Sequence, residues 1–129
     1  MSKRIFVVYG HHNVKKSFNA SIRDTFIDEA KKNGHEVDLI NLHEEKPLNF
    51  FDGSPPNEQV LNYRTRLEKC DIMFMISPCY NLRATAILEN WIDLVLAPKW
   101  FFAFKRVVGN WGYPVAGVMK NKLAIMSMS

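Results

Sequence analysis

The chain has few of the features that mark secreted, zinc-binding or membrane-spanning proteins. Its 129 residues include two cysteines, Cys70 and Cys79, which lie nine positions apart without a CxxC motif. This spacing indicates neither a disulfide framework nor a zinc knuckle, and we expect two free thiols. No apolar run approaches the roughly 18 residues of a membrane-spanning helix, and the run from Ile5 to Tyr9 is too short for a signal-peptide core. The composition therefore predicts a cytoplasmic protein without a membrane span.

Positive charge exceeds negative charge only slightly, and the basic residues are spread along the chain. The formal net charge is +4, and the densest basic groups are short: Lys15-Lys16, Lys31-Lys32, Lys105-Arg106, and Lys120 with Lys122. We predict no nucleic-acid partner, because such a partner favours a concentrated basic patch, and the phosphate of a small ligand suits these groups better. The length suits one domain with a real core, and we assign residues 1–129 to a single domain.

Motifs for metal or nucleotide binding are also missing. His11 and His12 are adjacent, with His35 and His43 as possible partners, but no HxxxH or HExxH pattern supports a metal site. We predict no metal, and a histidine that points at a bound phosphate is the favoured alternative. Neither GxGxxG nor a P-loop is present. Cys79 lies near a predicted helix start without a histidine or carboxylate beside it, which favours packing over nucleophilic catalysis.

The stretch from Asp71 to Leu96 organises the rest of the chain. Residues Ile72 to Ile76 are all apolar, as in a central parallel strand, and Ser77-Pro78 ends the strand because proline cannot donate to a ladder. A polar turn follows, and Thr85 is suited to cap a helix whose apolar residues recur at three- and four-residue spacing. They are Ile87, Leu88, Trp91, Ile92, Val95 and Leu96. Their spacing favours a core role for Trp91 over ligand contact.

Two further strand-and-helix patterns precede this stretch. Arg4 to Gly10 and His35 to Leu42 predict two strands. The helix between them should end at Asn33-Gly34. The apolar residues expected on one face of this helix are Phe18, Ile22, Phe26, Ile27 and Ala30. A long surface loop over 44–57 should be pinned to the body by Leu48, Phe50 and Phe51. Pro56 should stand in the first turn of a helix through Lys69, with these residues inward: Val60, Leu61, Tyr63 and Leu67.

The end of the chain combines an aromatic segment with one more strand. Ala97-Pro98 breaks the helical pattern, residues 99–122 predict a loop, and Leu123 to Met128 predicts the last strand. The order β-α-β-α-β-α-β predicts an α/β fold with a doubly wound parallel sheet and right-handed crossovers. With the first and third strands side by side at the switch point, the turns after Tyr9 and Ile76 face one crevice, where ligands bind in such sheets.

Two groups of residues in these loops have more than one interpretation. The helix start after the first turn suits an anion, with Ser17 and Asn19 as donors and Lys15-Lys16 as charge; alternatively, Ser17 only caps the helix and the lysines are solvated. The aromatic segment suits either stacking on a planar ring or a subunit interface, and both remain open. Its aromatic residues are Trp100, Phe101, Phe102, Phe104, Trp111 and Tyr113.

Five short motifs occur in one order along nearly the whole chain. They are Gly10-His11 with Ser17-Phe18-Asn19, P-x-Y-N at Pro78 to Asn81, A-I-L-x-x-W-I-D at Ala86 to Asp93, Phe102-Ala103-Phe104, and G-x-x-K-x-K at Gly117 to Lys122. Together they resemble the flavodoxin-like fold family of NAD(P)H:quinone oxidoreductases and azoreductases. The resemblance implies a sheet in strand order 2-1-3-4, with the family's usual fifth strand missing.

The resemblance also implies a function and a set of site residues. The expected protein is a homodimeric NAD(P)H dehydrogenase (quinone) with FAD or FMN as cofactor, NAD(P)H as co-substrate and a quinone-like acceptor, and the flavin rather than a side chain does the chemistry. The implied residues at the flavin phosphate are His11, Ser17, Phe18 and Asn19, and those beside the flavin ring are Pro78, Cys79, Tyr80, Asn81 and Leu82. The aromatic segment, with Trp100, Phe102 and Phe104, is expected to complete the partner's flavin and substrate pocket.

Two departures from the family pattern add an alternative. His12 stands where many members have proline, and the strand at Ala124 to Met128 reaches Ser129 where the family continues into a Thr-Thr-Gly-Gly type loop. The second departure favours a catalytically weak or flavin-free regulatory or partner subunit of the same fold. A simple electron-carrying flavodoxin is disfavoured, because flavodoxins lack this aromatic segment. FMN and FAD both remain open.

Overall fold

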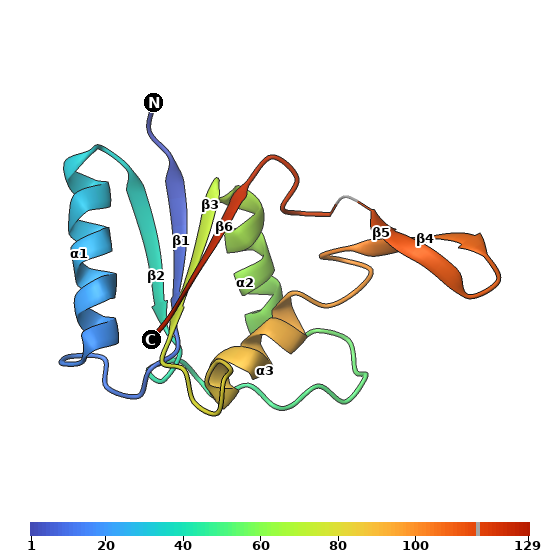
Figure 1. Cartoon of the computed structure of the whole chain (residues 1–129), viewed down its shortest axis with the longest axis horizontal. Coiled ribbons are helices and arrows are strands. Elements are labelled where there is room, and N and C mark those ends of the chain that lie inside the picture. The colour runs from blue at the N-terminus through green and yellow to red at the C-terminus, as the bar shows by residue number, and fades with distance from the viewer. Residues whose placement is uncertain (116) are drawn as a thin grey trace.

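The computed structural model describes residues 1–115 and 117–129; Ala116, part of the predicted aromatic loop, lies outside them. A four-stranded parallel sheet in the order β2-β1-β3-β6 forms the centre of the molecule (Figure 1). Its strands are β1 (Arg4–Tyr9), β2 (Glu36–Asn41), β3 (Ile72–Ser77) and β6 (Leu123–Met128). The predicted α/β fold and the order of its four sheet strands are confirmed, each strand lying within a residue or two of its predicted bounds.

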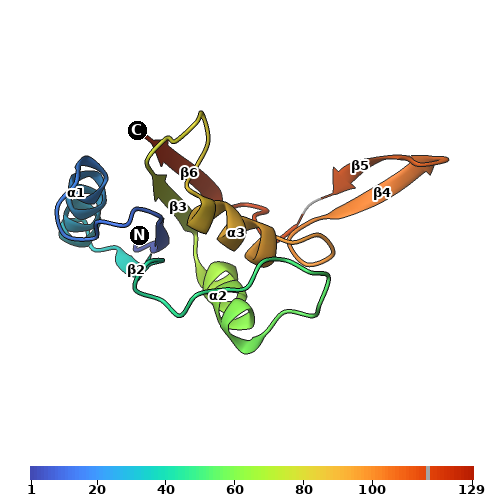
Figure 2. The ribbon, with the colours of Figure 1, turned by 90° about the horizontal axis from the view of Figure 1, so that it is seen from below.

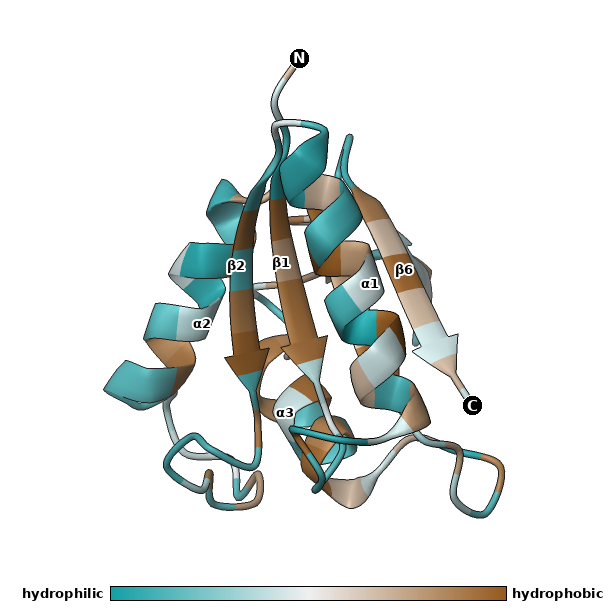
Figure 3. Cartoon of the chain, turned by 90° about the vertical axis from the view of Figure 1, so that its left-hand side faces the viewer, coloured by the Kyte–Doolittle hydropathy of each residue, from teal (hydrophilic) through white to brown (hydrophobic). Residues whose placement is uncertain are grey.

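Among the described residues, three helices cover the sheet from both sides (Figure 2). They are α1 (Phe18–Lys32) on one face, and α2 (Glu58–Lys69) and α3 (Ala86–Val95) on the other. Figure 3, which views the molecule from the α1 side, shows β1 as a mostly hydrophobic strand and β2 as a mixture of hydrophobic and hydrophilic residues. None of the described helices has the length and the apolar character needed to cross a membrane.

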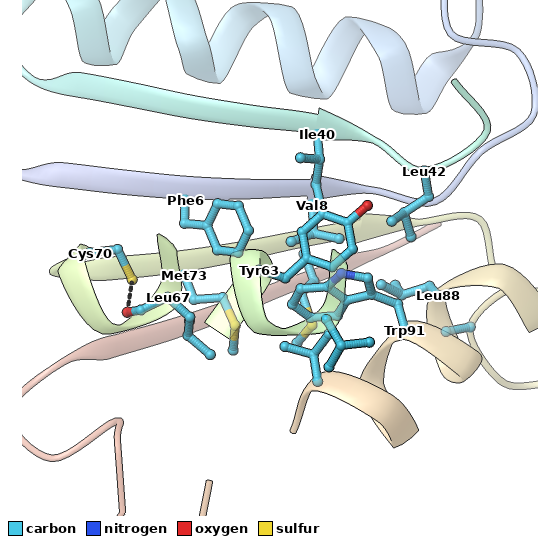
Figure 4. Close-up of a cluster of buried hydrophobic side chains, with 14 residues drawn as sticks. Phe6, Val8, Ile40, Leu42, Tyr63, Leu67, Cys70, Met73, Leu88 and Trp91 are labelled. Atoms are coloured by element: carbon cyan, nitrogen blue, oxygen red, sulfur yellow. Dashed lines mark hydrogen bonds between the residues drawn. The ribbon is translucent and has the colours of Figure 1, made fainter. Parts of the chain in front are cut away.

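Alternation along β1 divides the core into two layers. Phe6 and Val8 point toward α2 and α3, whereas Ile5, Val7 and Tyr9 point toward α1, because successive side chains of a strand face opposite ways. Figure 4 shows the larger layer, in which Trp91 of α3 packs near Tyr63 of α2. Trp91 and Tyr63 are almost completely buried, so the predicted core role of Trp91 is confirmed.

Side chains fix where the helices begin. Ser17 caps α1 by accepting a hydrogen bond from the Ala20 N–H at 3.0 Å, and Asn57 caps α2 in the same way with Val60 at 2.9 Å. Thr85 holds the cap position of α3, as predicted, but its hydroxyl makes no bond to that helix. The Thr85 side chain is therefore free to hold another part of the chain.

The predictions for the long loop and for two helix faces were partly wrong. Phe50 and Phe51 are exposed, and only Leu48 of the three predicted anchors packs against the core. Pro56 precedes the cap at Asn57 instead of entering α2. Leu61 of α2 and Phe18 of α1 are exposed as well, since each lies beside rather than on the buried stripe of its helix.

The predicted aromatic loop contains a β-hairpin. Strands β4 (Ala103–Val108) and β5 (Trp111–Val115) pair antiparallel and project from the body as an arm (Figure 1). Gly109-Asn110 joins them, and Gly109 has φ 53°, as tight hairpin turns require. The arm is exposed along most of its length, and Trp111 is 83% accessible. Such two-stranded hairpins are only marginally stable alone, so the arm is suited to contact another surface.

The two leucines of α2 allow a test of this packing. Leu67 has 0% exposure, whereas Leu61 is 48% exposed on the same helix. Leu67→Ala should lower the free energy of unfolding by roughly 2–5 kcal/mol because it leaves a cavity in the core. Leu61→Ala, the matched control, should lower it by less than about 0.5 kcal/mol. Urea unfolding followed by far-UV circular dichroism measures both, and similar losses in the two variants would contradict the placement.

Candidate functional site

The turns that follow β1 and β3 lie side by side at the carboxyl ends of the strands (Figure 1). The Gly10 N–H donates to the Ile76 carbonyl at 2.9 Å, and the Thr85 hydroxyl donates to the Gly10 carbonyl at 2.6 Å. Ser77 completes the link, because its hydroxyl oxygen accepts the Thr85 N–H at 3.0 Å. A Cβ atom at Gly10 would lie 3.0 Å from the Leu88 Cβ and 3.1 Å from the Thr85 hydroxyl oxygen, which is tighter than most side-chain contacts, so glycine suits this close approach. The two turns are therefore neighbours, as the strand order predicted.

Hydrogen bonds with side chains set the shape of the first turn, which follows β1. The Asn13 side-chain oxygen accepts the N–H groups of Lys15 and Lys16 at 3.2 and 2.9 Å. The Tyr9 hydroxyl donates to the Asn13 carbonyl at 2.9 Å and lies 2.9 Å from the Ser17 hydroxyl. These contacts bring the turn up to the start of α1, where the first N–H groups of a helix have no partner within the helix.

Three histidines gather at the ends of β1 and β2. The rings of His11 and His12 stack at 4.3 Å, and His43 meets His12 edge-on at 6.4 Å. The Asn13 N–H donates to His11 Nδ1 at 2.8 Å, which leaves the other ring nitrogen as the hydrogen-bond donor when His11 is neutral. Burial, and next the neighbouring His12, lower the pKa of His11. Neither these histidines nor any other three His, Cys, Asp or Glu residues within residues 1–115 and 117–129 are placed so that they could hold a metal ion.

The turn after β3 is closed and strained. Tyr80 and Arg83 exchange two backbone hydrogen bonds, of 3.0 and 3.1 Å, around Asn81 and Leu82. Both central residues have positive φ, 51° for Asn81 and 62° for Leu82, which asparagine tolerates and leucine rarely adopts. Leu82 is also 96% exposed. An exposed leucine in this conformation is strained without any packing in the chain to compensate, and strain of this kind clusters at functional sites.

Ser129 links the two turns to the end of β6. Its carbonyl accepts the Cys79 N–H at 2.8 Å, and its hydroxyl lies 3.1 Å from the Asn19 side-chain oxygen. Asn19 is buried, and Cys79 is an exposed free thiol. Two of the predicted site groups, the Asn19 side-chain oxygen and the Cys79 N–H, are thus engaged within the chain.

The structure brings together nine of the predicted site residues and separates three. The two turns carry His11, Ser17, Phe18, Asn19, Pro78, Cys79, Tyr80, Asn81 and Leu82. Trp100 and Phe102 lie just before β4 and Phe104 lies within it, and the hairpin of β4 and β5 projects away from these turns (Figure 1). There Trp100 donates to Glu68 at 3.3 Å and stacks under Arg64 at 4.9 Å. Within one chain, the aromatic group and the turns do not form one site.

Two hollows on the α2 and α3 side were missed, because the loop over 44–57 carries no recognisable motif. One has a volume of about 270 Å³ between that loop and α3, and the other has a volume of about 720 Å³ beside Trp100. The smaller one is lined in part by His43, Leu48 and Trp91. The Trp91 indole N–H is buried without a hydrogen-bond partner among the described residues. None of the nine residues of the two turns lines either hollow.

The sequence pattern of the family described as flavodoxin-like fold matches residues 3–129, and the chain belongs to this family. A ribosyldihydronicotinamide dehydrogenase [quinone] of Mus musculus is 25% identical over 152 residues, which cover 98% of this chain and 63% of that protein. An FMN-dependent NADH:quinone oxidoreductase of Clostridium perfringens is 28% identical over 142 residues, covering 100% of this chain and 69% of that protein. The chain thus spans less than two thirds of the length of the mouse relative.

Solved structures show the same fold. An NAD(P)H:quinone oxidoreductase from Methanothermobacter marburgensis superposes with a TM-score of 0.75 at 17% identity, covering 99% of this chain and 66% of that one. An FMN-dependent NADH-azoreductase from Bacillus anthracis in complex with FMN superposes with a TM-score of 0.72 at 12% identity, covering 98% and 68%.

The lowered pKa of His11 predicts a pH dependence of stability. The folded protein disfavours protonated His11, whereas the unfolded chain protonates at the usual value near 6.5, so the free energy of unfolding should fall as the pH drops below about 6.5. His11→Asn should remove part of this loss. His12→Asn should remove a smaller part, because it deletes one neighbouring charge but leaves the burial. Urea unfolding at pH 5.5 and 7.5 measures the effect, and an unchanged loss in His11→Asn would refute it.

Proposed function

We propose that this chain works as a flavin-dependent NAD(P)H:quinone oxidoreductase, with the flavin held between the turns after β1 and β3. The observation that carries the proposal is the hydrogen bond from Gly10 to Ile76, since it joins two turns at one edge of the sheet. The first of these turns is polar and basic, and the second exposes apolar side chains. The names of the mouse and Clostridium perfringens relatives support a quinone acceptor, and the name of the Clostridium perfringens relative supports FMN.

The first turn fits the phosphate end of FMN or FAD. The start of α1 presents the N–H groups of Phe18 and Asn19 with the positive end of the helix dipole, and Lys15 and Lys16 are exposed beside it. A neutral His11 adds one ring N–H. Ser17 acts mainly through the cap, because its hydroxyl already bonds to Ala20 and Tyr9.

The second turn fits the ring end of the cofactor. Tyr80 is 48% exposed and Leu82 is almost fully exposed, so the side chains of this turn offer an apolar surface to a planar ring. When bound, a flavin accepts a hydride from NAD(P)H and passes it to a quinone-like acceptor. The chain's own part is to hold the phosphate and to fix the ring against this turn, and no side chain need act as acid or base.

We further propose a homodimer in which the projecting arm of one subunit covers the two turns of the other. The arm carries exposed Phe104, Trp111 and Tyr113, and exposed aromatic groups of this kind mark contact sites. Trp100 and Phe102 lie at its base and, with Phe104, are our candidates for contact with the planar substrate. The two free cysteines agree with the reducing cytoplasm, which we propose as the location.

A second candidate function is a flavin-free regulatory or partner subunit of the same fold. The engagement of Asn19 and Cys79 by Ser129 favours it, because these bonds occupy two groups that would otherwise be free to hold a cofactor. Such a subunit would keep the arm and its exposed aromatic residues, and would act through the contact they make.

A spectrum and an activity assay separate the two candidates. The oxidoreductase should be purified yellow or take up added FMN or FAD, and should oxidise NADH or NADPH with menadione as acceptor. Tyr80→Asp should weaken flavin binding at least about tenfold, because a carboxylate replaces the aromatic surface beside the ring and repels the cofactor's negative charge. Equilibrium dialysis with absorbance detection measures the binding.

Phe51→Asp is the control for this substitution, since Phe51 is also an exposed aromatic residue but belongs to neither turn. It should retain flavin as the wild type does. Unchanged flavin content in Tyr80→Asp would refute the ring site. A colourless wild-type protein that binds neither added FMN nor FAD would refute the oxidoreductase and favour the regulatory subunit.

The arm allows a test of the dimer. The double variant Phe104→Ser/Trp111→Ser removes two exposed aromatic side chains, and it should shift the protein to a monomer and lower quinone reduction at least about tenfold. Phe50→Ser/Phe51→Ser removes two exposed aromatics from another loop and should leave the dimer intact. Sedimentation velocity measures the mass, and a monomeric wild-type protein would refute the homodimer.

A further inference from the structure

Arg23 of α1 is an arginine buried beside the first turn, and its side chain has no role in the proposed function so far. The residue is 7% exposed, which is rare for arginine. Its guanidinium donates to the Val14 carbonyl at 2.8 Å, to the Asn41 side chain at 3.0 Å and to Asp24 at 2.7 Å. A buried charge is costly unless several partners compensate it, so the arrangement calls for an explanation beyond packing.

Two of these partners lie at the carboxyl ends of strands, where the candidate site is. Asn41 is the last residue of β2, and Val14 belongs to the first turn, directly before Lys15. Asp24, the one acidic partner, is itself more than half exposed, so its charge is partly solvated. The bond to Val14 fixes the backbone of the turn next to its two lysines.

Arg23 also reaches the turn by a second route. Its guanidinium carbon lies 4.5 Å from the centre of the Tyr9 ring, a cation–π contact. The Tyr9 hydroxyl in turn holds the Asn13 carbonyl and the Ser17 hydroxyl, and Ser17 caps α1. Arg23 thus supports the turn directly at Val14 and indirectly through Tyr9, at the residues that precede the free N–H groups of the helix.

We propose that Arg23 is a positioning residue that holds the first turn in the shape that recognises the phosphate group of the flavin. This inference rests on the proposed function and adds to it the residue that sets the preference for a phosphorylated flavin. Arg23 does not touch the cofactor. It orders the turn whose N–H groups and lysines do, and its buried positive charge adds to the favourable potential for an anion.

Lysine cannot replace this geometry. A guanidinium presents donors in a fixed fork and stacks flat on an aromatic ring, whereas an ammonium is a compact charge that cannot reach Val14, Asn41 and Asp24 at once. Arg23→Lys keeps the charge but loses part of the fork, and Arg23→Met keeps much of the length but loses both. Together the two variants separate the effect of charge from that of geometry.

The test compares FMN with riboflavin, which carries the same ring and ribityl chain without the phosphate. Binding of each to the flavin-free protein is measured by fluorescence quenching. The wild type should prefer FMN, and Arg23→Met should lower the FMN affinity at least about tenfold while changing the riboflavin affinity less than about twofold. The FMN affinity of Arg23→Lys should lie between those of the wild type and Arg23→Met. Arg4→Met, at an exposed arginine paired with Glu36 near the other end of the sheet, should keep the wild-type preference.

A second variant covers the case in which Arg23→Met does not fold. Tyr9→Phe keeps the ring under the guanidinium and removes only the hydroxyl, so it should also reduce the preference for FMN over riboflavin. An unchanged preference in Arg23→Lys and Tyr9→Phe, or an equal loss of affinity for both ligands, would overturn the positioning role. A wild-type protein that binds FMN and riboflavin equally would also overturn the positioning role, but it would leave the proposed flavin site intact. A wild type that binds neither would overturn the flavin site and this inference together.

Discussion

The pairing of β1 with β3 is the constraint on which the rest of the molecule depends. It aligns Tyr9 with Ile76 and sends the two chain segments that follow into the same space, where Gly10, Ser77 and Thr85 tie them together. The helix that starts after Thr85 then covers the sheet, so the residue that precedes α3 also holds the two turns together. Parallel strands end at a common edge, and polar turns from distant parts of the sequence meet there.

Much of this arrangement follows from local sequence patterns. The uninterrupted apolar run Ile72–Ile76 could be buried only as a central strand, and Pro78 left it no way to continue. The alternation of strands and helices restricted the topology further, because crossovers are right-handed and short. The nearness of the two turns was therefore predictable before any side-chain contact was known. The hydrogen bonds that set the shape of each turn were not, since they join residues that no pattern connects.

The errors have physical causes of the same kind. Hydrophobic residues of the loop over 44–57 were expected to pack inward, but Phe50 and Phe51 are exposed, and only Leu48 of the three packs against the core. Gly109-Asn110 is typical of a hairpin turn, but the aromatic residues around it were interpreted as a ligand or interface segment. The arm was therefore predicted as a loop. The sequence pattern of α1 does not mark Arg23 as a buried residue. Its burial depends on Tyr9 and Asn41, which come from other elements.

The closed turn at Asn81 and Leu82 has a consequence for the rate and the strength of association. Two reciprocal backbone bonds already hold it in a conformation that a free peptide would seldom visit. The conformational entropy of this turn is lost when the chain folds. A molecule that binds against Leu82 therefore does not have to order the turn when the complex forms. Contacts there should form without a slow rearrangement of the backbone, which makes the turn a rigid edge against which a flat ring can be aligned.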